Sequence, residues 1–263
     1  MRERFEGIVL FKRKHREHDA LVKIFTAAYG TKMFFVKRLE KPNHPMGSQL
    51  IPLTMNEYIG TINQEGLSFL TEASTIQFNR LVQSDYTVQA YAAYISQLVD
   101  SVVDDNVPNL LVYELFKLAL ALLNEGKSPE IIATYIEIYL LKGFGVQLKW
   151  DACVICGAKQ QPFDFSIRQH GVLCQQHFSE DEFRLHISPK AMYITSLLAQ
   201  IKLEQVQTVN VSQETLAEIR RLMDEIYKEY VGIRLKSKSY LDQMLEKDRK
   251  FIQMLKRDKP TAE

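Results

Sequence analysis

Cysteine is scarce in this chain, which has three cysteines among 263 residues. Three thiols cannot form a closed disulfide framework, and the charged residues Arg2, Glu3 and Arg4 exclude the apolar core of a secretory signal at the start of the chain. Long apolar runs are also absent. The longest strongly apolar run is Leu118–Leu123, far shorter than the roughly 20 residues of a membrane-spanning helix. We therefore expect a reducing, cytoplasmic location and no membrane contact.

The common catalytic motifs are missing as well. The sequence contains no G-x-x-x-x-G-K-[ST], G-x-G-x-x-G, G-x-S-x-G or H-E-x-x-H pattern. The segment from His15 to Asp19 is rich in polar residues, but it lacks the glutamate placement of a zincin helix and is better interpreted as a polar turn. An ATP-driven or hydrolytic role therefore lacks its usual parts.

Charge is distributed unevenly along the chain. Although the formal net charge is only +1, residues 1–50 contain eleven Lys/Arg and five Asp/Glu. Residues 51–130 contain three Lys/Arg and ten Asp/Glu. Residues 231–263 contain nine Lys/Arg and five Asp/Glu. Single charge runs are commonly no more than solvated faces, but basic ends around an acidic middle also suit the binding of a polyanion.

The first third of the chain has the pattern of short strands. Five segments rich in Val, Ile, Phe, Tyr and Thr are separated by turn residues such as Tyr29-Gly30 and Asn63 to Gly66. We predict strands at Gly7–Phe11, Ala20–Ala28, Thr31–Val36, Gln49–Ile62 and Leu67–Thr75. Five strands in about seventy residues suit an OB-like barrel, which leaves a sheet face open to single-stranded nucleic acid.

Basic residues fall at one pair of turns of this predicted barrel. One group follows the first strand and the other follows the third. We expect them to contact DNA phosphates; they are Lys12, Arg13, Lys14, Arg16, Lys37, Arg38 and Lys41.

From Ser84 onward the period of the apolar residues becomes helical. Residues 88–102 have one apolar face, and residues 110–123 are apolar nearly all round, which predicts a buried central helix. Ser128, Ser188 and Ser212 are expected N-caps, the first two followed by proline at the first helical position. The helices after Ser188 and Ser212 are expected to end near 203 and 230, and a basic amphipathic helix should cover 239–256. Trp150 should pack the segment that follows it against this bundle.

The three cysteines belong to one spaced pattern. Cys153-x2-Cys156 is followed, after seventeen residues, by Cys174-x2-His177. Two such knuckles supply the four soft or borderline ligands that tetrahedral zinc prefers, and a closed shell of four leaves no position for a reactive water. We therefore predict a structural Zn²⁺ site.

Two alternatives to this ligand set remain. His170 and His186 are close enough in sequence to replace His177 as the fourth ligand. A redox role for Cys153 and Cys156 is also possible, but such a pair normally lies where a strand meets a helix in a βαβ unit, and no such unit is predicted here.

Several motifs, taken in order, resemble one bacterial family, the RecO recombination mediators. In the barrel region these are Gly7-Ile8-Val9-Leu10, Ile24-Phe25-Thr26, Val36-Lys37-Arg38 and Leu50-Ile51-Pro52-Leu53. Further along the chain they are Gly143-Phe144-Gly145, Cys153-x2-Cys156-Gly157, Gly171-Val172-Leu173-Cys174 and Gly232-Ile233-Arg234-Leu235-Lys236-Ser237. The resemblance extends over essentially the whole chain.

The resemblance implies an α+β protein with three parts. These are an OB-fold over residues 1–80, a helical domain over 81–257 with a zinc-ribbon-like lobe at about 150–180, and a frayed tail over 258–263. It also implies a nucleoid-associated, non-enzymatic role in recombinational DNA repair. Similar proteins bind single- and double-stranded DNA, anneal complementary strands, engage the acidic tail of single-strand-binding protein, and work with RecR to load RecA. Many of them have a fourth cysteine where this chain has His177, and some lack the metal.

Two other functions are compatible with the residues. One is a metal-dependent nuclease that uses carboxylates of the acidic middle segment. The other is a zinc-ribbon scaffold that binds only protein. Strand cleavage with added magnesium would indicate the first, and the absence of salt-dependent affinity for oligonucleotides would indicate the second.

Overall fold

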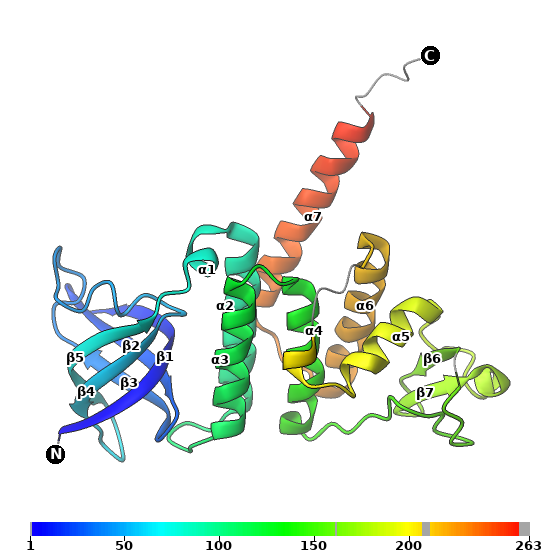
Figure 1. The fold of residues 1–263 in the computed structure, drawn as a ribbon, viewed down its shortest axis with the longest axis horizontal. Coiled ribbons are helices and arrows are strands. Elements are labelled where there is room, and N and C mark those ends of the chain that lie inside the picture. The colour runs from blue at the N-terminus through cyan, green and yellow to red at the C-terminus, as the bar shows by residue number, and fades with distance from the viewer. Residues whose placement is uncertain (1, 161, 207–210, 258–263) are drawn as a thin grey trace.

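A computed structural model describes residues 2–160, 162–206 and 211–257 of the protein. Figure 1 shows an elongated arrangement, with a β-barrel at one end, a group of helices in the middle and a small two-stranded lobe at the other end. The predicted α+β organisation, with an OB-like barrel before a helical domain, is confirmed. The tail expected over 258–263 lies outside the described residues.

Five strands close into the barrel in the order β1-β2-β3-β5-β4. All neighbouring pairs are antiparallel except β3 and β5, which are parallel. The strands are β1 (Arg2–His15), β2 (Asp19–Thr26), β3 (Gly30–Val36), β4 (Met55–Thr61) and β5 (Ser68–Gln77). Alternate residues of these strands fill the interior, where Val9, Val22, Phe34 and Tyr58 are fully buried.

Two of the predicted strand boundaries were wrong. β1 is much longer than Gly7–Phe11, because it pairs with β4 along its first half and with β2 along its second half. The strand predicted at Gln49–Ile62 begins only at Met55. Residues 49–54 form a turn instead, in which the Thr54 hydroxyl donates to the carbonyls of Gln49 and Ile51 and Leu53 has a φ of 69°.

The helical part begins directly after the barrel. Its main helices are α1 (Arg80–Ser84), α2 (Tyr86–Val102), α3 (Leu110–Asn124), α4 (Pro129–Leu140), α5 (Pro189–Leu198), α6 (Gln213–Ile226) and α7 (Lys236–Arg257). The predicted N-caps are confirmed: the hydroxyls of Ser128, Ser188 and Ser212 accept hydrogen bonds from the first turns of α4, α5 and α6. Short helical segments cover Leu141–Phe144, Gln175–Glu180, Leu203–Gln205 and Tyr227–Val231.

Three helix predictions need correction. The helix α5 ends at Leu198 and not near 203, and α7 begins at Lys236 and not at 239. The helix after Ser212, in contrast, ends close to residue 230 as predicted, with a π-helix over Tyr227–Val231 and Gly232 in the left-handed conformation. The helix α3 is only partly buried, since Leu110 and Leu111 are 57% and 75% exposed. These two side chains are exposed despite the apolar sequence, whereas Val112 and Tyr113 of the same turn are buried.

The barrel is packed firmly on the helices through the outer face of β1 and β2. Ile8, Leu10 and Phe25 point out of the barrel into the same hydrophobic core as the bundle. Beside them, the Lys23 ammonium lies 2.6 Å from a carboxylate oxygen of Asp100 and 2.8 Å from one of Asp105. This face of the barrel is therefore closed, and a ligand of the barrel has to bind elsewhere on it.

In the part of the chain that the structure describes, no helix combines the length and the apolar character needed to span a membrane. The helix α7 is amphipathic and basic, and Figure 1 shows it extending away from the bundle.

Candidate functional site

The four predicted metal ligands come together at one point of the lobe. The strands β6 (Phe163–Ser166) and β7 (Gly171–Cys174) form an antiparallel pair, and Cys174 is the last residue of β7. The Cys153 knuckle lies alongside β7, where Val154 N donates to Val172 O at 2.9 Å. The ligand atoms of Cys153, Cys156, Cys174 and His177 all lie within 4.8 Å of one another.

Two glycines allow this close arrangement. Gly157 closes the first knuckle with a φ of +73°, and its N–H donates to Cys153 O at 2.9 Å. Gly171 lies so close to the preceding segment that a Cβ would be 2.6 Å from Lys149 O. A larger residue at either position would move one pair of ligands relative to the other.

The spacing of the ligand atoms suits a tetrahedral metal. The sulfurs of Cys156 and Cys174 are 3.8 Å apart, and the Nδ1 atom of His177 is 3.2 Å from the Cys174 sulfur and 3.8 Å from the Cys153 sulfur. Two sulfur ligands of a tetrahedral zinc with bonds of about 2.3 Å would lie about 3.8 Å apart. The group can therefore hold a metal ion without a large rearrangement.

The electrostatic surroundings favour the thiolate that a metal needs. Burial raises the pKa of the Cys153 thiol, but backbone N–H groups of Cys156, Cys174 and Ile155 stabilise the anion and lower the pKa to about 6. Burial and the neighbouring sulfurs raise the pKa of the Cys174 thiol. Binding of a cation would offset that rise, because it attracts all three thiolates.

The two alternative histidines lie in other surroundings. The His170 ring packs against Tyr230, with ring centroids 5.2 Å apart. His186 donates its backbone N–H to Asp164. Trp150 behaves as the sequence predicts: it is buried, with its ring 5.1 Å from Phe165 of β6.

The predicted DNA-contacting cations lie at one end of the barrel. Lys12, Arg13 and Lys14 are near the C-terminal end of strand β1, and Arg16 is in the β1–β2 turn. The second group follows β3. All seven side chains are exposed; the second group consists of Lys37, Arg38 and Lys41.

Three contacts tie these two basic groups together. Arg38 N donates to Asp19 Oδ1 at 2.8 Å, and Glu40 N donates to His18 O at 2.9 Å. The Lys12 ammonium is 3.2 Å from Glu40 Oε1. The β1–β2 turn and the segment after β3 therefore form one basic surface, although Lys12 is partly neutralised by Glu40.

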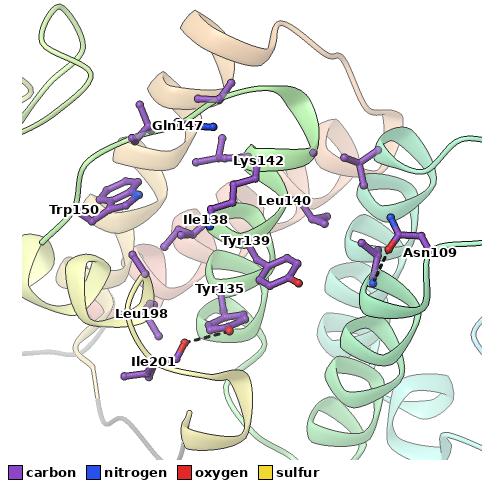
Figure 2. A pocket seen from close by; sticks show the side chains of 17 residues that line it. Asn109, Tyr135, Ile138, Tyr139, Leu140, Lys142, Gln147, Trp150, Leu198 and Ile201 are labelled. Carbon is purple, nitrogen blue, oxygen red and sulfur yellow. Dashed lines mark hydrogen bonds between the residues drawn. The ribbon is translucent and has the colours of Figure 1, made fainter.

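A cavity in the helical part was not predicted in detail from the sequence. It has a volume of about 680 Å³ and lies around the end of α4. Figure 2 shows that its lining combines apolar and aromatic side chains such as Tyr135, Tyr139 and Trp150 with one cation, Lys142. Tyrosines in helical patterns usually belong to the core, so the sequence gives little sign that Tyr139 is 39% exposed.

The fold and the site together define a protein with an OB-like barrel, an exposed basic end and a lobe whose Cys3His group could hold a metal ion. Two models of known families match the chain. "Recombination protein O N terminal" matches residues 1–79, and "Recombination protein O C terminal" matches residues 83–239.

Curated relatives narrow the identity further. A protein of Enterococcus faecalis called DNA repair protein RecO is 44% identical over 239 residues, which cover 91% of each chain. Proteins of the same name from Lactiplantibacillus plantarum and Lactococcus lactis are 40% and 38% identical over 91% of this chain, and over 93% and 94% of their own lengths. The chain belongs to the RecO family of DNA repair proteins, as the motifs predict.

Proposed function

We propose that this protein is a non-enzymatic recombination mediator that binds single- and double-stranded DNA and anneals complementary strands. The observation that carries the proposal is the exposed basic surface at one end of an OB-like barrel whose outer face along β1 and β2 is closed by the helices. Membership of a family of DNA repair proteins supports it.

Annealing follows from the charge of this surface. Two complementary strands repel each other through their phosphates, and a cationic surface that neutralises both of them raises the rate at which their bases meet. No nucleotide hydrolysis is needed for this step. Lys37 and Arg38 are the residues we expect to matter most, because both are exposed and neither side chain forms an ion pair with a described residue, whereas Lys12 is paired with Glu40.

The Cys3His group supports a structural zinc ion. Three thiolates and one imidazole are soft or borderline ligands, which favours zinc over magnesium or calcium. The ion would join the Cys153 knuckle to the end of β7 and so hold the lobe together. Because the lobe and the barrel lie at opposite ends of the molecule (Figure 1), the metal would act on stability and not on DNA contacts.

The cavity around the end of α4 is our candidate for the tail of single-strand-binding protein. The resemblance to the RecO family implies that this tail is an acidic segment that ends in an aromatic residue. A cavity lined by apolar side chains, by Tyr139 and Trp150 and by the cation Lys142 offers both an aromatic pocket and a charge partner. Lys142→Glu should therefore weaken binding of a fluorescent tail peptide at least tenfold, whereas Lys159→Glu, in the lobe and outside the cavity lining, should not. Equal binding by the wild type and Lys142→Glu would place the peptide elsewhere.

RecR and RecA complete the proposed pathway, with RecA loaded indirectly onto DNA coated with single-strand-binding protein. Mediation of this kind requires DNA binding and tail binding at the same time, and the barrel and the α4 cavity are separate surfaces that allow it.

The test of the proposed function is an annealing assay with two complementary labelled oligonucleotides, with and without magnesium. We expect the protein to accelerate duplex formation without ATP and to leave both strands intact. Cleavage that depends on magnesium would indicate a nuclease instead. Failure to bind either strand at low salt would indicate a protein scaffold.

A further inference from the structure

The outer face of the barrel carries a continuous row of paired residues beside its basic end. Arg13 of β1 lies opposite Leu21 of β2, Leu21 lies opposite Phe35 of β3, and Phe35 lies opposite Phe69 of β5. Paired residues share one face of a sheet. Phe34, next to Phe35, is inside the barrel core, so Phe35 and its row point outward.

This row gathers aromatic rings on the surface. The Phe35 and Phe69 centroids are 6.3 Å apart, with an interplanar angle of 76°. On the other side of Phe35, the His15 ring lies 6.0 Å away, at an angle of 89°. Phe69 is 46% exposed and Phe35 is half-buried. Three rings in contact, with one edge open to solvent, form an apolar surface that the fold itself does not need to expose.

Cations border the aromatic row. Arg13 belongs to the row itself, and Lys37 follows the end of β3, two residues beyond Phe35. Both side chains are exposed. The carboxylate of Asp19, which lies opposite His15, accepts the backbone N–H of Arg38. The surface thus combines flat aromatic rings with exposed positive charge, which complements a ligand that is both aromatic and anionic.

We propose that Phe35 and Phe69, with His15 beside them, form a stacking platform for the unpaired bases of single-stranded DNA. The proposal rests on the proposed function. It adds contacts with the DNA bases to the phosphate contacts that the basic end makes. Bases stack on aromatic side chains without regard to sequence, and cations beside the rings hold the backbone.

The platform selects unpaired strands. Successive bases in B-DNA are 3.4 Å apart, whereas the two phenylalanine rings are 6.3 Å apart and steeply inclined. Two bases can rest on the two rings only after they have separated from each other. A duplex keeps its bases stacked and paired, so it can use the basic surface but not the rings.

The experiment compares two oligomers of about 15 nucleotides with the same number of phosphates, oligo-dT and an abasic strand, by fluorescence anisotropy. The wild type should bind oligo-dT at least tenfold more tightly than the abasic strand, and this ratio should persist at high salt, because stacking is not screened. Phe69→Ala should reduce the ratio about tenfold and leave the salt dependence unchanged. Duplex affinity should not change.

Matched variants separate stacking from folding. Phe69→Trp should keep the ratio, and Phe69→Leu, which retains apolar bulk without a flat ring, should lower it. Phe183 in the distal lobe is 90% exposed, so Phe183→Ala is a control that should have no effect. Circular dichroism checks that each variant folds.

Failure of the platform is distinguishable from failure of the proposed function. The platform proposal is contradicted if the wild type binds both strands equally and with strong salt dependence. It is also contradicted if Phe69→Ala and Phe35→Ala keep the full ratio of the two affinities. Either result is compatible with DNA binding by the basic surface. If the wild type binds neither strand, both proposals are wrong.

Discussion

At the scale of single residues, the Cys3His group makes the most direct prediction. The purified protein should contain about one zinc ion per chain. Cys156 is exposed, so Cys156→Ser removes little packing, and any large loss of stability would report the loss of the ion. We expect this variant to lose zinc and melt at a lower temperature, while the folded fraction keeps its DNA affinity.

His170→Ala is the control for this prediction, because the His170 ring packs on Tyr230. It should retain zinc, as measured by elemental analysis. Loss of zinc in this variant, or a metal-free wild-type protein with an unchanged melting temperature, would contradict the proposed ligand set.

Glu137 provides a second prediction at this scale. Its side chain is buried between α2 and α4 and accepts a hydrogen bond of 2.5 Å from Tyr94. Burial raises the pKa of this carboxyl from 4.5 to about 7. Since the folded state holds the proton more tightly than the unfolded state, this group lowers the free energy of unfolding as the pH rises from about 4.5 to about 7.

Glu137→Gln should remove that part of the pH dependence. Relative to the wild type, the variant should gain up to about 3 kcal/mol between pH 4.5 and pH 7.5. Urea unfolding at several pH values measures the difference. A difference between wild type and variant that does not vary with pH would show that Glu137 is ionised throughout this range.

How far the sequence predicts a residue's role depends on whether the role is local. The spacing of Cys153, Cys156, Cys174 and His177 requires only two tight turns, so the sequence predicts the cluster that the structure forms. Phe34 and Phe35 are adjacent, and alternation indicates that they face opposite sides of a strand. Which of them enters the core depends on the closure of the barrel, and residue types alone do not determine it.

At the scale of elements, the contact between the barrel and the helices should be sensitive to Lys23. This side chain is 12% exposed and has two carboxylate partners, Asp100 and Asp105. Burial alone would lower the pKa of the ammonium, but the two partners raise it. Lys23→Ala would leave Asp100, which is 21% exposed, without its cation.

We expect Lys23→Ala to lower the free energy of unfolding by about 2 kcal/mol, since part of the ion cluster is open to solvent. The urea midpoint measures this change. Lys117→Ala is a suitable control because Glu114, with which it forms an ion pair, is exposed and 3.9 Å away. An equal effect of the two substitutions would mean that the Lys23 cluster adds nothing to the interface.

The sequence predicts the position of a helix or strand correctly where an N-cap residue or the periodicity of the apolar residues marks it. Serine caps and prolines place the starts of α4 and α5 correctly. The end of α5 and the start of β4 were predicted wrongly, because turns decide them. The β4 start depends on hydrogen bonds of Thr54 and on the left-handed Leu53, and neither leaves a recognisable pattern in the chain.

At the scale of the whole molecule, three surfaces are well separated. The basic end and aromatic row belong to the barrel, the cavity with Lys142 belongs to the helices, and the Cys3His group lies in the distal lobe (Figure 1). Each can be changed without touching the other two. The charge segregation of the sequence is consistent with this layout, although α7 extends away from the barrel and does not continue its basic surface.

The most direct test of the central claim, that the basic end of the barrel holds DNA, is the salt dependence of affinity for a single strand. If about five phosphates are neutralised, log affinity should fall against log salt with a slope of about −3.5, roughly a hundredfold loss between 50 and 200 mM. Changing Lys37 and Arg38 together to Glu should weaken binding to every sequence alike and flatten the slope by about one to two units. An unchanged slope in the double variant would contradict the claim and make the basic helix α7, with Lys247, Arg249 and Lys250, the better candidate.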